Sequence, residues 1–126
     1  MTNTFCGTVI YMAPEVFRHC YSQAADVFSF GLMLWELLYC VRCTSGMHSD
    51  LQSKFSQPLA VIGKLLESND NRPQLPLPGS PVHVDEEIVR LIKDAWRSDP
   101  TDRPTFELIA QFLGAYNRRA ISEVQN

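Results

Sequence analysis

Apolar side chains occupy almost every position from Val27 to Val41, and this stretch constrains the fold more than any other feature. Only Ser29 and Glu36 interrupt the run with strongly polar groups. A helix that crosses a bilayer needs about 20 apolar residues, so the stretch is too short to be one. A helix that is apolar nearly all round is covered by protein on every side. The sequence therefore predicts a buried central helix from about Ser22, a good N-cap, to Cys40.

Other helices are predicted to surround the central one. Signals that begin a helix lie at Pro14, Pro58, Asp85 and Thr105, and apolar residues at helical spacing follow the last three. We expect the last helix to end or loosen at Gly114. Its inward residues are expected to be Leu108, Ile109, Phe112 and Leu113. A length of 126 residues suits one domain, and without clean two-residue alternation the expected fold class is all-α.

The charge balance excludes two classes of binding protein. Eleven Lys and Arg residues stand against fourteen Asp and Glu residues, which gives a net charge of −3. No basic excess is available to neutralise nucleic-acid phosphates, and Arg118-Arg119 is too small for a polybasic membrane anchor. Residues 1–6 show neither the basic nor the apolar region of a signal peptide, so a cytoplasmic location is expected.

The four cysteines are Cys6, Cys20, Cys40 and Cys43. The spacing of Cys40 and Cys43, with His48 nearby, suits a metal ion, but a structural zinc site wants a second pair. A redox pair would follow a strand, whereas this one ends an apolar helix. We therefore predict no metal site and favour small apolar thiols at a helix end, with metal binding as the open alternative.

Three clusters of residues go beyond generic helix patterning. They are residues 7–15 (GTVIYMAPE), residues 26–31 (DVFSFG) continued by 34–37 (LWEL), and residues 96–106 (WRSDPTDRPTF). In this order and spacing they closely resemble the C-terminal half of the eukaryotic protein kinase domain, over about residues 2–116. The phrase from Arg72 to Pro76 is similar to the tyrosine-kinase-like group of Ser/Thr kinases.

Several motifs of that family are not found in the printed sequence. It contains no Gly-rich G-x-G-x-x-G loop, no V-A-I-K lysine, no H-R-D and no D-F-G. The resemblance thus implies the helical large-lobe portion of the kinase fold over residues 1–117, without a nucleotide lobe, followed by a frayed tail at 118–126. Phosphoryl transfer needs metal ions, a phosphate-holding lysine and a base. We expect the chain to be inactive alone and to hold no cofactor, whereas the complete family domain uses ATP and Mg²⁺.

The resemblance also assigns roles to particular residues. Gly7 and Thr8 would form the substrate loop in its Ser/Thr-kinase form, although Thr8 could equally be a simple turn hydroxyl. Glu15 is expected to pair with Arg103, with a surface glutamate at a helix start as the alternative. Asp26 would accept backbone N–H groups of the catalytic loop, or local donors at the start of its helix where that loop is missing.

The remaining assignments are weaker. Met33 and Leu37 resemble positions that support the column beneath the adenine, and plain core packing fits them in either case. Thr2 and Thr4 lie where activation-loop phosphosites occur in the family, with an unmodified terminus as the alternative.

The leading interpretation is part of a Ser/Thr protein kinase domain that supplies a substrate loop and a helical scaffold. Its partners would be protein substrates or regulators. The alternatives are a non-catalytic binding module derived from a kinase lobe, and no independent function. Because a layer of the family fold is missing, part of residues 27–38 is expected to face solvent and to favour self-association.

Overall fold

The computed structural model describes residues 11–43, 58–68 and 71–125. In these ranges the chain forms four α-helices: α2 (Gln23–Tyr39), α4 (Leu59–Leu66), α5 (Glu86–Ala95) and α6 (Phe106–Gln125). Two short 3₁₀ helices, η1 (Pro14–Arg18) and η3 (Pro100–Asp102), complete the set. The described ranges contain no strand, so the predicted all-α class is confirmed.

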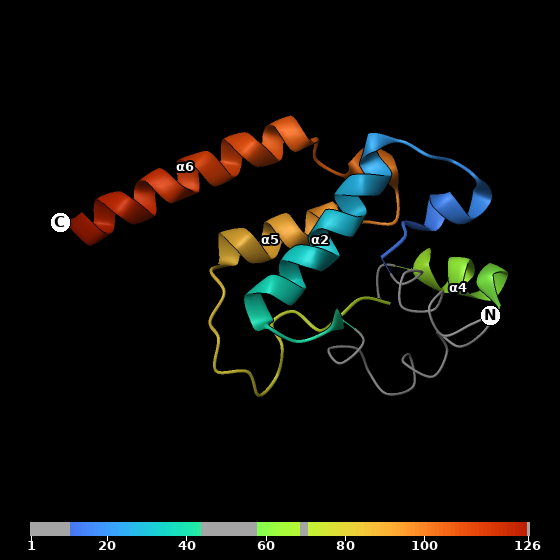
Figure 1. The fold of residues 1–126 in the computed structure, drawn as a ribbon, viewed down its shortest axis with the longest axis horizontal. Helices are drawn as coiled ribbons and strands as arrows, with labels where there is room; N and C mark the ends of the chain where they lie inside the picture. Colours follow the sequence, from blue (N-terminus) through green and yellow to red (C-terminus); the bar gives the residue numbers. More distant parts are fainter. Residues whose placement is uncertain (1–10, 44–57, 69–70, 126) are drawn as a thin grey trace.

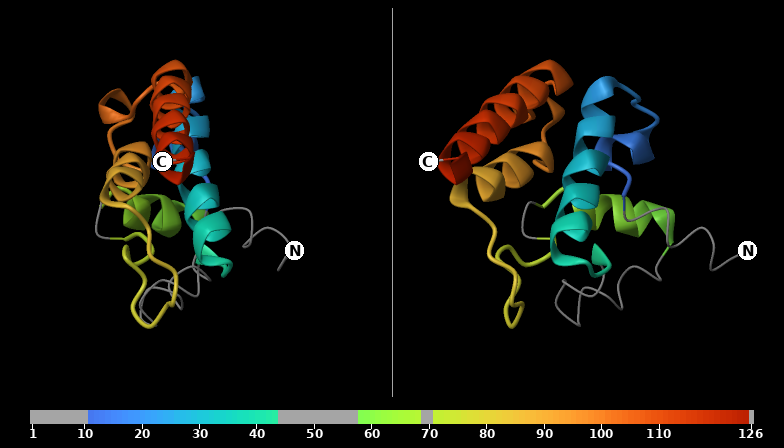
Figure 2. Two further views of the ribbon diagram at one scale, coloured as in Figure 1. Left: turned by 90° about the vertical axis from the view of Figure 1, so that its left-hand side faces the viewer. Right: turned by 60° about the vertical axis from the view of Figure 1, so that its left-hand side comes forward.

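Helix α2 lies between two groups of elements, with α5 and α6 on one side and η1 and α4 on the other (Figures 1 and 2). Its predicted bounds are confirmed, because Ser22 is the N-cap residue and Cys40 is the C-cap residue, although the Ser22 hydroxyl makes no capping hydrogen bond. Cys40 adopts the left-handed conformation, with a φ of 59°, and its N–H donates to the carbonyl of Glu36 at 2.8 Å. This geometry ends a helix by satisfying one of its last carbonyl groups.

The core forms where α2 meets its neighbours. Phe28, Leu32 and Trp35 of α2 are almost fully buried, and the indole N–H of Trp35 donates to the carbonyl of Gln74 at 3.0 Å. The cluster also takes side chains from α4 and α5, including Ile62, Leu66, Ile88 and Ile92. Long-range packing of this kind, more than helix propensity, stabilises helices in proteins.

Gly31 allows α2 and α5 to approach closely. A Cβ atom at Gly31 would lie 3.0 Å from the Cβ atom of Ala95 and 3.4 Å from the carbonyl oxygen of Ile92. Larger side chains at this crossing would push the two helices apart. The contact therefore depends on two small residues facing one another.

One side of α2 is open, which corrects the expectation that protein covers the helix on every side. The side chains of Met33 and Leu37 are 56% and 73% exposed, so plain core packing is wrong for both. The core residues from α4 and α5 pack against other side chains of α2, including Phe28, Leu32 and Trp35. The exposure agrees with the separate expectation that part of residues 27–38 faces solvent.

The last helix is longer than its sequence predicts. Helix α6 continues through Gly114 to Gln125, so the predicted break at Gly114 is wrong and residues 118–125 are helical. A glycine costs a helix only about 1 kcal/mol relative to alanine, which other contacts offset. Leu108 is 56% exposed instead of inward, whereas Ile109 is buried. Figure 1 shows the C-terminal end of α6 projecting away from the other helices.

The start of α6 follows the sequence more closely. Thr105 Oγ1 accepts a hydrogen bond from the backbone N–H of Leu108 at 3.2 Å, which is the predicted capping role. Across residues 11–43, 58–68 and 71–125, no helix combines the length and the apolar character that crossing a bilayer requires.

Candidate functional site

The 3₁₀ helix η1 carries the first candidate residue, Glu15. Pro14 fits the first turn because its fixed φ matches a helix and its missing N–H needs no partner there. His19 ends the element in the left-handed conformation, with a φ of 62°, and its N–H donates to the carbonyl of Val16 at 2.9 Å. Within this short turn, Pro14 and Glu15 are both buried.

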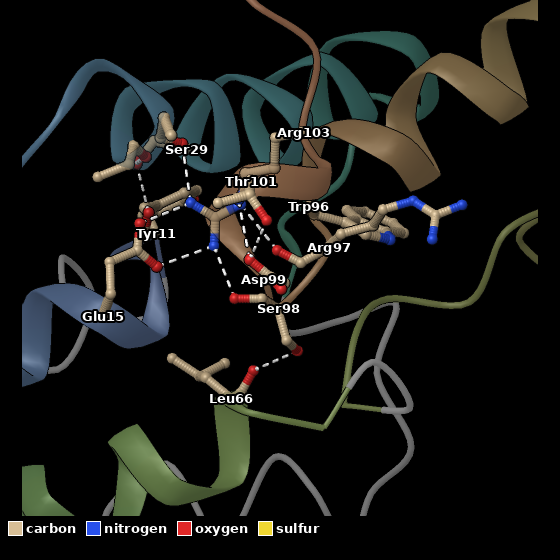
Figure 3. A network of polar contacts seen from close by, with 12 residues as sticks. Tyr11, Glu15, Ser29, Leu66, Trp96, Arg97, Ser98, Asp99, Thr101 and Arg103 are labelled. Atoms are coloured by element: carbon tan, nitrogen blue, oxygen red, sulfur yellow. Dashed lines mark hydrogen bonds and ion pairs between the residues drawn. The ribbon is translucent and has the colours of Figure 1, made fainter.

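Glu15 forms a bidentate ion pair with Arg103, which lies far away in the sequence. Arg103 Nη1 lies 2.6 Å from Glu15 Oε2, and Arg103 Nη2 lies 2.9 Å from Glu15 Oε1. The two side chains are 0% and 5% exposed. Two parallel charge-assisted hydrogen bonds give such a pair strength and a fixed orientation. The pair ties η1 to the segment that joins η3 to α6 (Figure 3).

Arg103 also serves backbone carbonyl groups of two other segments. Its Nε donates to Arg97 O at 2.7 Å, and its Nη2 donates to Ser98 O at 3.1 Å. A further bond runs from Nη1 to Ala24 O, in the first turn of α2, at 2.9 Å. A buried charge is tolerated when its donors are satisfied in this way. One side chain thus joins η1, α2 and the turn after α5.

A second buried arginine, Arg72, was not singled out by the sequence as a site residue. The guanidinium carbon of Arg72 lies 4.8 Å from the centre of the Phe28 ring, and that of Arg103 lies 5.1 Å from it. Burial, together with the positive charge of Arg103, lowers the pKa of Arg72 to about 10. The signal available in the sequence was an arginine followed by proline at the start of the connector.

Tyr11 and Glu36 form a second polar group, on the open side of α2. The phenol of Tyr11 donates to Glu36 Oε2 at 2.8 Å, and Ser29 Oγ donates to the carbonyl of Tyr11 at 2.5 Å. Burial and then the hydrogen bond to Glu36 raise the pKa of the Tyr11 phenol well above its ordinary value. These bonds hold the segment before η1 against α2.

The two described cysteines of the C-x-x-C pair differ in environment. Cys40 is exposed, whereas Cys43 is fully buried and its thiol donates to the carbonyl of Leu32 at 3.3 Å. Burial, aided by the Glu36 carboxylate, raises the pKa of the Cys43 thiol well above its ordinary value. A metal ligand must be a thiolate, so this environment disfavours metal binding at Cys43. His48 lies outside the described residues.

Asp26 lies in the first turn of α2 with an exposed side chain. No side-chain hydrogen bond joins the Asp26 carboxylate to another described residue, so it does not use the local helix-start donors expected for it. It borders a recess of about 490 Å³ whose wall includes Met12, Tyr21 and Ser29. The carboxylate is therefore free to accept donors from outside the described part of the chain.

Met33 and Leu37, together with Tyr11 and Glu36, line a separate recess of about 500 Å³. The two apolar side chains are half-exposed or more, so they form a surface on this side of α2. The predicted substrate-loop residues Gly7 and Thr8, and the candidate phosphosites Thr2 and Thr4, lie outside the described residues.

Comparison with known proteins agrees with these features. The family model described as the protein kinase domain matches residues 1–113. A protein kinase and PP2C-like domain-containing protein of Arabidopsis thaliana is 34% identical over 106 residues, which cover 79% of this chain and 16% of that protein. The seven transmembrane domain-containing tyrosine-protein kinase 1 of Dictyostelium discoideum is 36% identical over 116 residues, covering 91% of this chain and 15% of that protein.

A mitogen-activated protein kinase kinase kinase 10 of Xenopus laevis is 33% identical over 119 residues, covering 94% of this chain and 10% of that protein. The chain therefore spans only a small part of the length of each of these relatives. The family model, in contrast, matches most of the chain itself. With its helical core, and with Glu15 and Arg103 each inside a kinase-like motif, the chain belongs to the protein kinase domain family.

Proposed function

We propose that this chain is the substrate-binding and scaffold portion of a Ser/Thr protein kinase domain. The complete domain would transfer the γ-phosphoryl group of ATP to a protein hydroxyl. The observation that carries the proposal is the buried Glu15–Arg103 pair. It fixes η1, which follows Gly7 and Thr8 in the chain, to the helical body. A substrate loop needs such an anchor, because catalysis by positioning is lost when the reacting groups shift by about 1 Å.

The choice of serine and threonine over tyrosine rests on Gly7 and Thr8. These residues match the Ser/Thr-kinase form of the loop, whereas tyrosine kinases usually carry proline and a basic residue there. The relatives include one named as a tyrosine-protein kinase and one named as a serine/threonine/tyrosine-protein kinase. The substrate hydroxyl therefore has to be measured directly.

Protein kinases use ATP and Mg²⁺, but the described residues do not fit either. In residues 11–43, 58–68 and 71–125, no group of three His, Cys, Asp or Glu could hold a metal ion. The family motifs that hold nucleotide are also not found in the printed sequence. We expect the chain alone to show no measurable binding of ATP at millimolar nucleotide concentration. Calorimetry that found saturable, Mg²⁺-dependent binding would contradict this.

A chimera tests the proposed function. The first half of a tyrosine-kinase-like Ser/Thr kinase, with its Gly-rich loop, lysine, H-R-D and D-F-G, would be joined before Thr2. The chimera should phosphorylate serine or threonine peptides and not tyrosine peptides in a radiolabel assay. A folded, soluble chimera without activity would reject the proposal.

Asp26 gives the chimera an internal test. In the chimera its carboxylate would accept backbone N–H groups of the donor's catalytic loop, so Asp26→Ala should lower activity by about 100-fold. The matched control is Glu86→Ala, which removes another exposed acid from the first turn of a helix. In the isolated chain Asp26→Ala should have little effect on stability, because the described residues give Asp26 no bond to lose. Equal activity of the two chimeric variants would show that Asp26 anchors nothing.

A non-catalytic binding module is the second candidate, favoured by the exposed side of α2. Met33 and Leu37 lie one turn apart on α2 and are 56% and 73% exposed. Adjacent exposed apolar side chains promote association with a protein regulator or with a second copy. Leu37→Lys should then shift the sedimentation profile towards monomer. Val61→Lys, at an exposed position of α4, is the matched control and should leave the profile unchanged.

A further inference from the structure

Arg72 is a buried cation that has no acidic partner among the described residues. It is 6% exposed, and its guanidinium bonds to backbone carbonyl groups instead. Nη2 donates to the carbonyl of Leu66, the last residue of α4, at 3.1 Å, and Nη1 donates to Ser68 O, just beyond the helix, at 3.1 Å. Nε donates to Trp96 O at 2.8 Å, at the C-terminal end of α5.

Helix ends explain why these carbonyls can replace an acid. The last carbonyl groups of a helix have no partner inside it, and they carry the negative end of the helix dipole. Arg72 therefore joins two helix ends and neutralises its charge on both. The planar guanidinium suits this task because its donors point in several fixed directions at once.

Helix α4, held in this way, packs directly against η1. A Cβ atom at Gly63 would lie 2.9 Å from the Cβ atom of Phe17, so the two elements meet without space for a side chain. Arg18 Nη1 also lies 2.9 Å from Glu67 Oε1. η1 is thus supported by α4 on one side and by Arg103 on the other.

Ser98 links these two supports of η1 by hydrogen bonds. Its carbonyl accepts from Arg103, while its hydroxyl donates to Leu66 O at 3.3 Å and accepts from Arg72 Nη2 at 3.2 Å. Figure 3 shows Ser98 between the Arg103 guanidinium and Leu66. The ring of Phe28 lies close to both cations, 4.8 Å from the guanidinium carbon of Arg72 and 5.1 Å from that of Arg103.

We propose that Arg72 is a second positioning residue for η1, acting through α4 although no bond joins it to η1. Loss of Arg72 would leave the Ser98–Leu66 hydrogen bond to hold the C-terminal end of α4 near the turn after α5. The surface that α4 offers to Phe17 and Arg18 can then shift, and the pair with Arg103 becomes the fixed support of η1. The inference rests on the proposed function in one respect: η1 matters for catalysis only if the segment before it binds substrate.

Hydrogen exchange of this chain, followed residue by residue, tests the inference. The reporters are the amides of Val16, His19 and Cys20, whose hydrogen bonds begin or end at a residue of η1. Arg72→Met keeps the length of the side chain and removes its donors, and the exposed Arg90→Met is the matched control. We expect the η1 amides of Arg72→Met to exchange at least about tenfold faster than those of the control, while the α2 amides are unchanged.

Two results would overturn the inference. The first is acceleration confined to α4 with normal exchange in η1, because α4 would then not position η1. The second is the same acceleration in every helix, which would make Arg72 a contributor to global stability only. If Arg72→Met does not fold, Arg72→Lys is measured against the same criteria. Lysine keeps the charge but cannot reach all these carbonyls together, so a smaller, still local acceleration is expected.

The outcome is independent of any kinase assay. Exchange is measured in this chain alone, without nucleotide or a donor lobe. If the exchange experiment fails, the proposed kinase function can still be supported by an active chimera. If the chimera is inactive, the coupling between Arg72 and η1 can still be supported by the exchange rates. The two proposals can therefore fail separately.

Discussion

Two arginine–carboxylate pairs in this molecule have the same bidentate geometry and very different surroundings. Arg103 contacts Glu15 at 2.6 and 2.9 Å, and both side chains are almost fully buried. Arg119 contacts Glu87 at 2.7 and 3.2 Å, but these side chains are 56% and 49% exposed. The distances alone suggest two pairs of similar strength. Because the Glu15–Arg103 pair is removed from water, however, losing one of its members costs far more stability than in the exposed pair.

The surroundings also decide what else each arginine does. Arg103 gives its remaining donors to backbone carbonyls of the turn after α5 and of α2. Arg119 lies over the ring of Tyr116 at 5.9 Å, on the outer part of α6. The buried arginine organises three segments, whereas the exposed one only fastens one helix to the start of another. Four experiments can break or sharpen this contrast.

Arg103→Ala should have the largest effect. It would leave Glu15 buried without its partner, and removing one member of a buried pair costs about 3–5 kcal/mol of unfolding free energy. Urea denaturation followed by circular dichroism measures the loss. Arg90→Ala, on an exposed face of α5, is the control and should cost less than about 0.5 kcal/mol. Equal losses would mean that burial of the Glu15 pair carries no special weight.

Replacing both members with apolar residues should have a smaller effect than removing one. Glu15→Leu combined with Arg103→Met leaves no buried charge, and such replacements are often close to neutral. The carbonyls of Ala24, Arg97 and Ser98 would still lose their donors, at about 1–3 kcal/mol for each group that stays unsatisfied. The double variant should therefore unfold at a urea concentration between those of Arg103→Ala and the wild type. A double variant less stable than Arg103→Ala would contradict this account.

Arg119→Ala should barely change stability. Its pair with Glu87 is exposed to water and salt, which screen the attraction. The urea midpoint should match that of the wild type at physiological salt, with any small difference disappearing at 1 M salt. A large loss that persisted at high salt would show that the outer half of α6 depends on this pair.

The smallest expected effect is a shift in one titration. The hydrogen bond from Arg119 lowers the pKa of the Glu87 carboxyl below its ordinary value. A lowered pKa in the folded state means that the contribution of the pair is present above the ordinary glutamate pKa and is lost as the pH falls through the folded value. NMR titration should show the lowered pKa in the wild type and its return to the ordinary range in Arg119→Ala. An unchanged pKa would exclude the hydrogen bond as its cause.

The sequence alone predicted most helix positions because their signals are local. Ser22 and Cys40 bound α2 as expected, and Thr105 caps α6. These features depend on a few neighbouring residues: the start of α6 on the Thr105 hydroxyl, the end of α2 on the left-handed Cys40, and both helices on apolar spacing. The kinase motifs were likewise readable, and the family match over residues 1–113 agrees with them.

Other features could not be predicted because they depend on residues distant in sequence. Gly114 looked like a helix end, yet α6 continues to Gln125, with Arg119 bonded to Glu87 of α5. Met33 looked like core from its apolar surroundings, but no local pattern tells which side of a helix its neighbours will cover.

Composition and motif order determined that this chain is helical, built around residues 22–40, and similar to part of a kinase domain. The tertiary structure alone decided which charges are buried and how their donors are satisfied. In the sequence Arg72 is a residue before a proline, and only the structure shows that its side chain bonds to carbonyl groups at the ends of α4 and α5. Burial is a property of the whole packed arrangement, and desolvation, which depends on burial, determines the strength of each polar contact.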